Sequence, residues 1–382
     1  MPPVKGGAVE NLIHCFVENN EKSKMAELTV FSSYDKIAKE ASERYKNTSF
    51  VYIQQRKTAE AITGFVNRAV RKLRFGACFQ NFPYLIDIVK SIKKSAFDCV
   101  IVENRPEFMP YLRKKLSLPI FLHMHNDCLN DRYYPARRVV KSATGIIAVS
   151  DYVKDRILTV KGAKGKVAVL RNVIDVKHFA ANTEETGKQL RQERDVKDTD
   201  VVFGFVGRIT PGKGVAELIQ AFSRVCAKHE NARLLVVGSG WFSSNEDSAY
   251  TRKLRALSAD IEDKIIFTGY VDYNRITEQY ASVDALVVPS VAGEACGLVV
   301  LEAMASGKAL IVSDSGGIPE HVDSDCAIIV SRGENFTNGL ASAMEELICD
   351  RQRMKSMGEH GSRRAAMYDK ENYLRDLLML TK

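Results

Sequence analysis

The sequence predicts an α/β protein built from two doubly wound parallel sheets in two domains. The chain has 382 residues, the length of two domains of ordinary size. Short runs of Val, Ile and Leu recur without polar alternation, as in strands that are buried on both faces of a parallel sheet. Stretches with helical periodicity separate these runs, so strand and helix alternate along the chain.

The apolar runs form two sets of six, and each set predicts one sheet. The first set is Leu28–Phe31, Phe50–Ile53, Cys99–Val102, Ile120–Met124, Ile146–Val149 and Val167–Leu170. The second set is Val201–Val206, Leu234–Val237, Lys264–Phe267, Ala285–Val288, Ala309–Val312 and Ala327–Val330. We therefore expect an N-terminal domain over 1–180, a polar linker over 181–200, a C-terminal domain over 201–365 and a final helical segment over 366–382.

Composition predicts a globular protein of the cytoplasm. Hydrophobic residues make up 45% of the chain and charged residues 27%, and no apolar run approaches the ~18 residues of a membrane span. Met1–Glu10 lacks the basic and apolar regions of a signal peptide. The eight cysteines form no C-x-x-C pair, which favours buried thiols in a reducing compartment.

Positive charge is concentrated in the first half of the chain. Residues 1–180 hold 31 Lys and Arg against 17 Asp and Glu, which favours an anionic partner such as a membrane surface, an anionic acceptor or nucleic acid. Basic motifs interleaved with aromatic residues are missing, so we expect no nucleic acid. The basic segment Phe65–Phe75 is typical either of a helix resting on anionic lipid or of an ordinary amphipathic helix.

A glycine-rich loop with two cations follows the first strand of the second set. Gly207 and Gly214 bracket Arg208 and Lys213, and a helix is expected from about Val215. Glycines let the backbone approach a ligand, and the two side chains add positive charge to the positive end of a helix. This pattern favours a pyrophosphate site over a solvated basic turn, and its spacing is not that of a Walker loop.

A second loop, of small residues, leads from the fourth strand of this set into another helix. Glu294 lies just before that helix and Glu302 lies inside it. The free amides of Gly297, Leu298 and Val299 suit a phosphate or sugar oxygen, and carboxylates accept hydrogen bonds from vicinal hydroxyls. By itself, Glu302 is equally well explained as a surface charge.

Two further glycine pairs lie at the starts of helices. Residues 314–320 contain Gly316-Gly317 directly after a strand, as in a loop close to a ligand or in a plain turn. Gly6 and Gly7 precede a helical run near the start of the chain and suit a phosphate or a sugar acceptor.

His123 and His125 end the fourth strand of the first set. The period of a strand places both on one face, which raises the possibility of a metal site. No spacing marks a third ligand, so we expect no metal and interpret His125 as a hydrogen-bonding residue of a cleft.

Taken together, these residues resemble the GT-B-fold glycosyltransferases, specifically the large retaining family 4. The resemblance covers nearly the whole chain and is strongest over 200–330. The segments that carry it are Gly207-Arg208 with Lys213-Gly214, Glu294 and Glu302 with seven residues between them, Asp314–Glu320, Arg171–Asp175 and Phe267–Val271.

The resemblance implies a role for each donor-side residue. Arg208 and Lys213 would bind the donor diphosphate, Glu294 would hold sugar hydroxyls and Glu302 the ribose. The amides of Gly297–Val299 would meet the sugar and phosphate.

The same family pattern implies further roles around the substrates. Tyr270 and Val271 would lie beside the base, His125 near the reacting sugar, and Gly6 and Gly7 in the acceptor-side loop. The final helix would cross back onto the N-terminal domain.

One departure from the family pattern concerns the start of the chain. The family has a strand of about six residues before its first glycine loop, in the middle of the N-terminal sheet, whereas only Met1–Lys5 precede Gly6 here. We expect either a truncated or misplaced start, or a sheet without a central strand.

The function expected from this reasoning is transfer of a hexose from a UDP- or GDP-sugar to a hydroxyl of a glycan or lipid-linked acceptor. The family implies retention at the anomeric carbon by a front-face route, and the setting would be envelope or capsular polysaccharide synthesis on the inner face of the membrane. Two cations would replace a metal, and no cofactor is expected. The alternatives are a nucleotide-sugar epimerase, a non-catalytic sugar-nucleotide binder and a phosphorylase, although no motif marks the pyridoxal-binding lysine that a phosphorylase needs.

Overall fold

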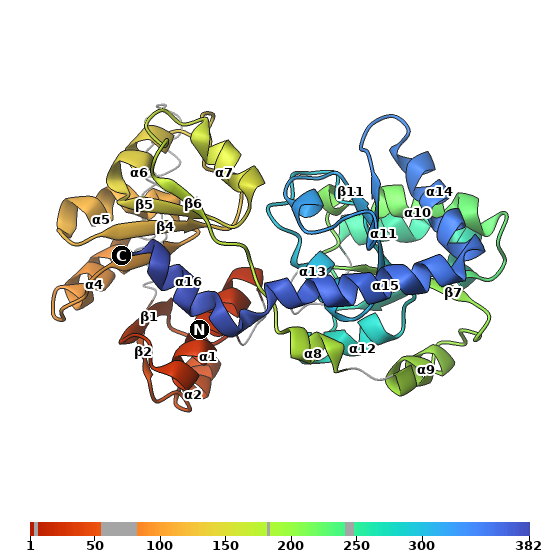
Figure 1. The fold of residues 1–382 in the computed structure, drawn as a ribbon, viewed down its shortest axis with the longest axis horizontal. Helices are drawn as coiled ribbons and strands as arrows, with labels where there is room; N and C mark the ends of the chain where they lie inside the picture. Colours follow the sequence, from red (N-terminus) through yellow and green to blue (C-terminus); the bar gives the residue numbers. More distant parts are fainter. Residues whose placement is uncertain (4–6, 55–81, 182–183, 241–247) are drawn as a thin grey trace. The chain divides into compact units, whose positions relative to one another are not determined.

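The structure is a computed structural model, and its ribbon is drawn in Figure 1. It describes residues 1–3, 7–54, 82–181, 184–240 and 248–382. The chain divides into two compact units, one comprising Met1–Asn172 with Glu371–Lys382 and the other Val173–Lys370. Each unit is an α/β domain, as the sequence predicts.

The second unit contains one sheet of six parallel strands in the order β12-β11-β10-β7-β8-β9. The strands are β7 (Val201–Val206), β8 (Ala232–Val237), β9 (Ile265–Gly269), β10 (Ala285–Val288), β11 (Ala309–Ser313) and β12 (Ala327–Val330). The six expected apolar runs therefore all form strands. This is the outcome that burial on both faces dictates, because every position of such a strand needs an apolar side chain.

Successive residues of these strands enter two different hydrophobic cores. Val201, Phe203 and Phe205 of β7 pack on one side, and Val202 packs on the other. The helices of the unit are α8 (Val176–Ala180), α9 (Glu184–Gln192), α10 (Val215–Cys226), α11 (Ala249–Leu257), α12 (Ile276–Ala281), α13 (Leu298–Ala305), α14 (Phe336–Cys349) and α15 (Arg351–Ala365). Short 3-10 turns join them at η2 (Pro211–Lys213), η3 (Ala259–Lys264), η4 (Tyr273–Arg275), η5 (Ile318–Glu320) and η6 (Ala366–Tyr368).

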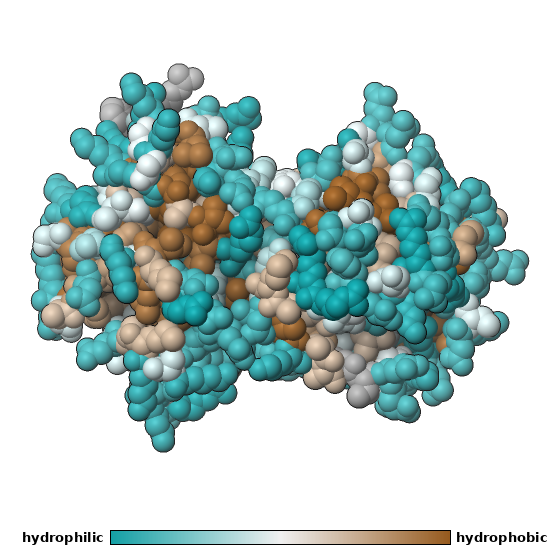
Figure 2. All heavy atoms as spheres, viewed as in Figure 1, coloured by the Kyte–Doolittle hydropathy of each residue, from teal (hydrophilic) through white to brown (hydrophobic). Residues whose placement is uncertain are grey.

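Helix α15 is amphipathic. Its buried positions are Met354, Met357, Gly358, Gly361 and Ala365, a spacing that gives one face of a helix. Hydrophilic side chains cover its outer side in Figure 2.

The sequence predicts a polar linker over 181–200, but the structure has a helix there. Helix α9 occupies much of this segment and packs on α12. Gly187 lies so close to α12 that an added Cβ would stand 2.4 Å from the Ala281 carbonyl oxygen, and Leu190 is buried. Arg191 pairs with Asp284 at 2.7 Å. A glycine, a buried leucine and polar contacts of Arg191 attach this helix, so the segment shows no apolar stripe in the sequence.

The described strands of the first unit form two parallel sheets. Strands β1 (Leu28–Ser33) and β2 (Thr48–Ile53) pair with each other, and the other sheet has the order β3-β4-β5-β6. Its strands are β3 (Val100–Glu103), β4 (Ile120–Met124), β5 (Gly145–Ala148) and β6 (Val167–Val169). Within the described ranges no strand pairs with both β1 and β3, so each keeps one edge without a ladder of backbone hydrogen bonds.

Helices of the first unit come from both ends of the chain. They are α1 (Ala8–Ser23), α2 (Lys36–Ser42), α4 (Phe82–Ile92), α5 (Met109–Lys115), α6 (Ala136–Ser142), α7 (Asp151–Leu158) and α16 (Tyr373–Leu380), with 3-10 turns η1 (Pro106–Phe108) and η7 (Lys370–Asn372). Tyr373 of α16 stacks on Phe16 of α1 at 4.5 Å between ring centroids, and the Leu374 amide donates to Asn19 Oδ1 at 3.2 Å. The last helix thus belongs to the first unit.

Among the described residues, no helix has the length and apolar character needed to span a bilayer. The basic segment Phe65–Phe75 lies outside the described residues, so its expected membrane contact stays a prediction.

Candidate functional site

Three loops of the second unit come together at the carboxyl edge of its sheet. They follow β7, β10 and β11, which are neighbours in the order β11-β10-β7. Because the strands are parallel, their carboxyl ends meet at one edge, which is where open α/β sheets bind ligands.

The loop after β7 depends on glycines for its close contacts. A Cβ on Gly214, whose φ is +72°, would stand 1.9 Å from the Pro289 carbonyl oxygen of the loop after β10. The amides of Val291 and Ala292 donate to the Gly212 carbonyl at 3.0 and 3.1 Å. These bonds hold the first two loops together. The exposed Arg208 lies on the first of them.

Two of the predicted site residues meet here. The Lys213 ammonium forms an ion pair with Oε2 of Glu294, although the residues lie 81 positions apart in the sequence. Both side chains are about three-quarters buried, with 27% and 21% of their surface exposed. A cation and a carboxylate are therefore held side by side at this edge.

The loop after β11 closes onto Glu294 from the other side. The Gly317 amide donates to the Glu294 carbonyl at 2.8 Å. Gly316 has a φ of +57°, and a Cβ there would stand 2.0 Å from the same carbonyl oxygen. Ser313 Oγ donates to the Ser290 carbonyl at 2.7 Å. The glycine pair predicted in this loop therefore serves a close backbone approach, not merely a turn.

Helix α13 begins directly behind Glu294. Gly297 is its N-cap with a φ of +77°, and Leu298 and Val299 form its first turn. The first amides of a helix have no acceptor within the helix and carry partial positive charge. The predicted anion-binding amides therefore lie three residues beyond the Lys213–Glu294 pair.

Glu302 lies farther along α13 and is buried, with 7% of its surface exposed. The phenol of Tyr280, on α12, donates to Oε2 of Glu302 at 2.6 Å. Burial raises the pKa of the Glu302 carboxyl to about 7, and the hydrogen bond from Tyr280 opposes that rise. The alternative of a surface charge is thus excluded by the structure.

Tyr270 and Val271 lie just after β9, the edge strand on the far side of β8 from β7. Both are partly buried, and Val271 packs against the hydrophobic core shared with α12 and α13. Their position beside a base stays a prediction.

Sequence reasoning missed a buried pair beneath the second loop. The thiol of Cys296 lies 3.2 Å from Nε2 of His321, and both residues are buried. The His321 ring also packs edge-on against Tyr368 at 5.2 Å. Because 25 residues separate Cys296 from His321, no local pattern could have paired them.

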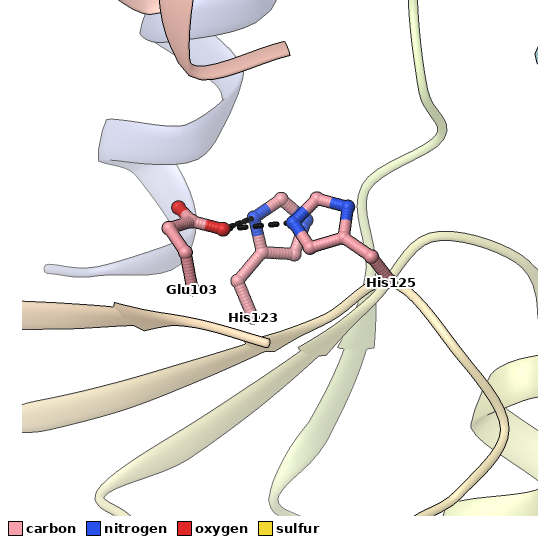
Figure 3. A group of neighbouring side chains, drawn as sticks. All are labelled: Glu103, His123 and His125. Atoms are coloured by element: carbon pink, nitrogen blue, oxygen red, sulfur yellow. Dashed lines mark hydrogen bonds and ion pairs between the residues drawn. The ribbon is translucent and has the colours of Figure 1, made fainter. Parts of the chain in front are cut away.

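In the first unit, His125 lies at the end of β4 beside a carboxylate that the sequence did not single out. Glu103 ends the neighbouring strand β3 and pairs in register with His123. Oε2 of Glu103 is 2.8 Å from His125 Nε2 and 3.1 Å from His123 Nδ1 (Figure 3). The register of two adjacent strands was the signal that could have found Glu103.

The charge state of this cluster follows from its burial and its partners. Burial would raise the pKa of the Glu103 carboxyl, but the two histidines outweigh it and hold that pKa well below its usual value. Burial, and next the neighbouring His123, lower the pKa of His125, while Glu103 opposes them. The carboxylate is therefore ionised at neutral pH, and His125 is neutral.

Two groups of described residues have the donor atoms of a metal site. Glu103, His123 and His125 form one, and Asp323, Asp325 and His360 form the other at the surface. In the second group Asp323 already pairs with Arg364 at 2.7 Å. The expectation that the protein uses no metal stays a prediction.

Of the predicted acceptor loop, Gly7 is the N-cap of α1, and its carbonyl accepts from the Asn11 amide at 2.9 Å. Gly6 lies outside the described residues. The role of this loop is untested.

Two family profiles match the chain. The profile of glycosyl transferases group 1 matches residues 187–364, and that of glycosyltransferase family 4 matches residues 37–178. The chain belongs to the group 1, family 4 glycosyltransferases. The loops after β7, β10 and β11 all lie within the group 1 match.

Relatives of this glycosyltransferase come from several bacteria. Spore coat protein SA of Bacillus subtilis is 27% identical over 374 residues, which is 96% of this chain and 91% of that protein. A GDP-mannose-dependent monoacylated α-(1-6)-phosphatidylinositol monomannoside mannosyltransferase of Corynebacterium glutamicum is 29% identical over 231 residues, 59% of this chain and 58% of that protein.

Solved structures share the fold of this glycosyltransferase. HepE of Anabaena, crystallised with UDP and glucose, superposes with a TM-score of 0.76 at 19% identity and covers 99% of this chain and 96% of its own. Sucrose-phosphate synthase of Thermosynechococcus elongatus superposes with a TM-score of 0.76 at 18% identity. The match covers 98% of this chain and 93% of that protein. The fold is therefore GT-B, as the sequence predicts.

Proposed function

We propose that this glycosyltransferase transfers a hexose from a UDP- or GDP-sugar to a hydroxyl of a glycan or lipid-linked acceptor. The observation that carries the proposal is the meeting of Lys213 with Glu294 directly before the first turn of α13. The donor binding that this implies is supported by the UDP bound to HepE and by the GDP-mannose dependence of the mannosyltransferase relative.

The chemistry of this edge suits a departing nucleoside diphosphate. Breaking the bond between sugar and phosphate leaves negative charge on the diphosphate, and preformed positive groups lower the energy of that transition state. Lys213, Arg208 and the amides at Gly297 would supply these groups without a metal ion. Glu294, whose carboxylate holds Lys213 in place, would accept hydrogen bonds from sugar hydroxyls.

Glu302 would bind the ribose of the donor. A carboxylate can accept a hydrogen bond from each of two vicinal hydroxyls. The phenol of Tyr280 uses one lone pair of Glu302 Oε2, and the other lone pairs of the carboxylate remain for the ribose. Retention at the anomeric carbon and metal independence follow from the family resemblance and are part of the proposal.

A lipid-linked or polysaccharide acceptor is supported by two features. Basic residues exceed acidic ones among residues 1–180, which favours an anionic acceptor or membrane. Relatives include the phosphatidylinositol monomannoside mannosyltransferase and a lipopolysaccharide 1,2-N-acetylglucosaminetransferase of Salmonella typhimurium. We therefore place the enzyme in envelope or capsular polysaccharide synthesis at the inner face of the membrane.

The test is a panel of UDP- and GDP-sugars with the purified protein, measuring nucleotide release with and without membrane lipid extract. We expect Lys213→Ala to lower kcat/KM by about 100-fold, the effect of losing one transition-state charge contact. The matched control is Lys228→Ala, because Lys228 pairs with Glu345 at 2.8 Å just beyond the far end of α10.

Each failure has its own meaning. No release of nucleotide with any donor would reject catalysis, and binding without turnover would favour a sugar-nucleotide binder. Conversion of the donor to another nucleotide sugar without an acceptor would identify an epimerase. An inverted anomeric linkage in the product, read by NMR, would reject retention.

A further inference from the structure

The cluster of Glu103, His123 and His125 contains buried ring nitrogens with no hydrogen bond to any residue that the structure describes. The side chains of His123 and His125 are almost fully buried, with 0% and 4% of their surface exposed. Nδ1 of His125 has no hydrogen-bond partner among the described residues. Buried polar atoms almost always have a partner, so an unpaired one indicates a group that the structure does not contain.

The backbone around the cluster is fixed on both strands. The Asn104 amide donates to the His123 carbonyl at 2.8 Å, and the His125 amide donates to Asn104 Oδ1 at 3.2 Å. These two bonds join the end of β3 to the end of β4. The carboxylate of Glu103 and the ring of His125 are therefore held in a defined relation.

The proton on His125 is assigned by what Glu103 can accept. An ionised carboxylate has no proton to donate, so the 2.8 Å contact requires a proton on Nε2 of His125. A neutral imidazole carries one proton, so Nδ1 is unprotonated and its lone pair can accept a hydrogen bond. Figure 3 shows that Nδ1 points away from Glu103.

His123 is the competing partner, and its geometry is poorer. Its Nδ1 lies 3.1 Å from the same oxygen of Glu103, but neither of its ring nitrogens has a hydrogen bond of acceptable geometry within the described part of the chain. Glu103 therefore aligns with His125 rather than with His123.

We propose that Glu103 is a positioning residue that fixes His125 with its proton on Nε2 and so presents Nδ1 as an acceptor for a sugar hydroxyl. The inference rests on the proposed function for its ligand, since sugar hydroxyls are the donors that this enzyme would bring to the site. It assigns to Glu103 a part in orienting the substrate that no motif in the sequence marks.

The first measurement needs no substrate. Two-bond proton–nitrogen correlation spectra of protein labelled with 15N-histidine distinguish the two neutral tautomers from the imidazolium. The chain has seven histidines, and comparison with His125→Gln assigns the signal. We expect the Nε2-protonated tautomer at pH 7. A proton on Nδ1, an imidazolium, or a tightly bound divalent metal at Nε2 would overturn the inference.

The second measurement compares the tautomer of His125 with kcat/KM in variants of Glu103. Glu103→Gln offers an amide that can donate as well as accept, so we expect mixed tautomers and a fall of roughly tenfold in kcat/KM, the loss of one hydrogen bond. Glu103→Asp keeps a carboxylate, so it should recover part of the Nε2-protonated tautomer and part of kcat/KM. The control is Glu107→Gln, which removes the same charge four residues away, where Glu107 pairs with the exposed Arg105. This variant should change neither the tautomer of His125 nor kcat/KM.

The outcomes separate this inference from the proposed function. If the wild type turns over no nucleotide sugar, the proposed function fails while the tautomer is still measured. If Glu103→Gln keeps the wild-type tautomer, or matches Glu107→Gln in kcat/KM, the positioning role of Glu103 is rejected while the donor chemistry stands.

Discussion

Replacing Glu302 by glutamine should change how the stability of the protein depends on pH. Glu302 is buried on α13 with Tyr280 as its hydrogen-bond donor, and burial raises its pKa from 4.5 to about 7. Below pH 4.5 the carboxyl is protonated in both the folded and the unfolded state. Between pH 4.5 and 7 the unfolded carboxyl loses its proton while the folded one keeps it, so rising pH favours unfolding.

The size of the effect follows from the shift. A difference of one pKa unit corresponds to about 1.4 kcal/mol, so a shift of this size makes a contribution of about 3 kcal/mol. That contribution is present below pH 4.5 and is lost as pH rises through about 7. Glutamine does not titrate, so Glu302→Gln should gain about 3 kcal/mol in unfolding free energy relative to the wild type between pH 4.5 and pH 8.

Urea unfolding followed by circular dichroism at intervals from pH 4.5 to 8 measures this difference. Glu359→Gln on the outer face of α15 is the control, because Glu359 is exposed and its charge costs little there. The measured quantity is the difference in unfolding free energy between Glu302→Gln and the wild type. A change in this difference of less than about 0.5 kcal/mol from pH 4.5 to 8, the size of an ordinary surface effect, would refute the reasoning.

Two other predictions concern the same edge of the sheet. Gly316→Ala should abolish donor turnover and lower stability by more than Gly307→Ala, because a Cβ at 316 would meet the Glu294 carbonyl at 2.0 Å whereas one at 307 meets no atom of the described residues within 4 Å. Both glycines have positive φ, so Gly307→Ala should cost only about 1–2 kcal/mol for that conformation, and equal losses in the two variants would contradict the close approach. Tyr280→Phe removes the hydrogen bond that lowers the pKa of Glu302. The midpoint of the pH dependence should move to higher pH, and an unmoved midpoint would show that the phenol does not act on the carboxyl.

The strands of both units could be predicted because each depends on its own residues. A run such as Ala285–Val288 is apolar and buried at every position, and only a strand buried on both faces uses such a run fully. The glycine loops were equally local, since Gly214 and Gly316 adopt conformations that other residues rarely take. The helix α9 was missed because Gly187, Leu190 and the polar contacts of Arg191 attach it, without an apolar stripe.

The sequence by itself determined where the strands lie, to within two residues at either end, and which loops carry charge, glycine and carboxylate. Only the tertiary structure decided which of those groups meet. Lys213 touches Glu294, and Glu103 touches His125, because parallel strands carry residues that are distant in the chain to one edge of a sheet. The pKa of Glu302 depends likewise on packing, since burial raises it and the opposing hydrogen bond comes from Tyr280 on another helix.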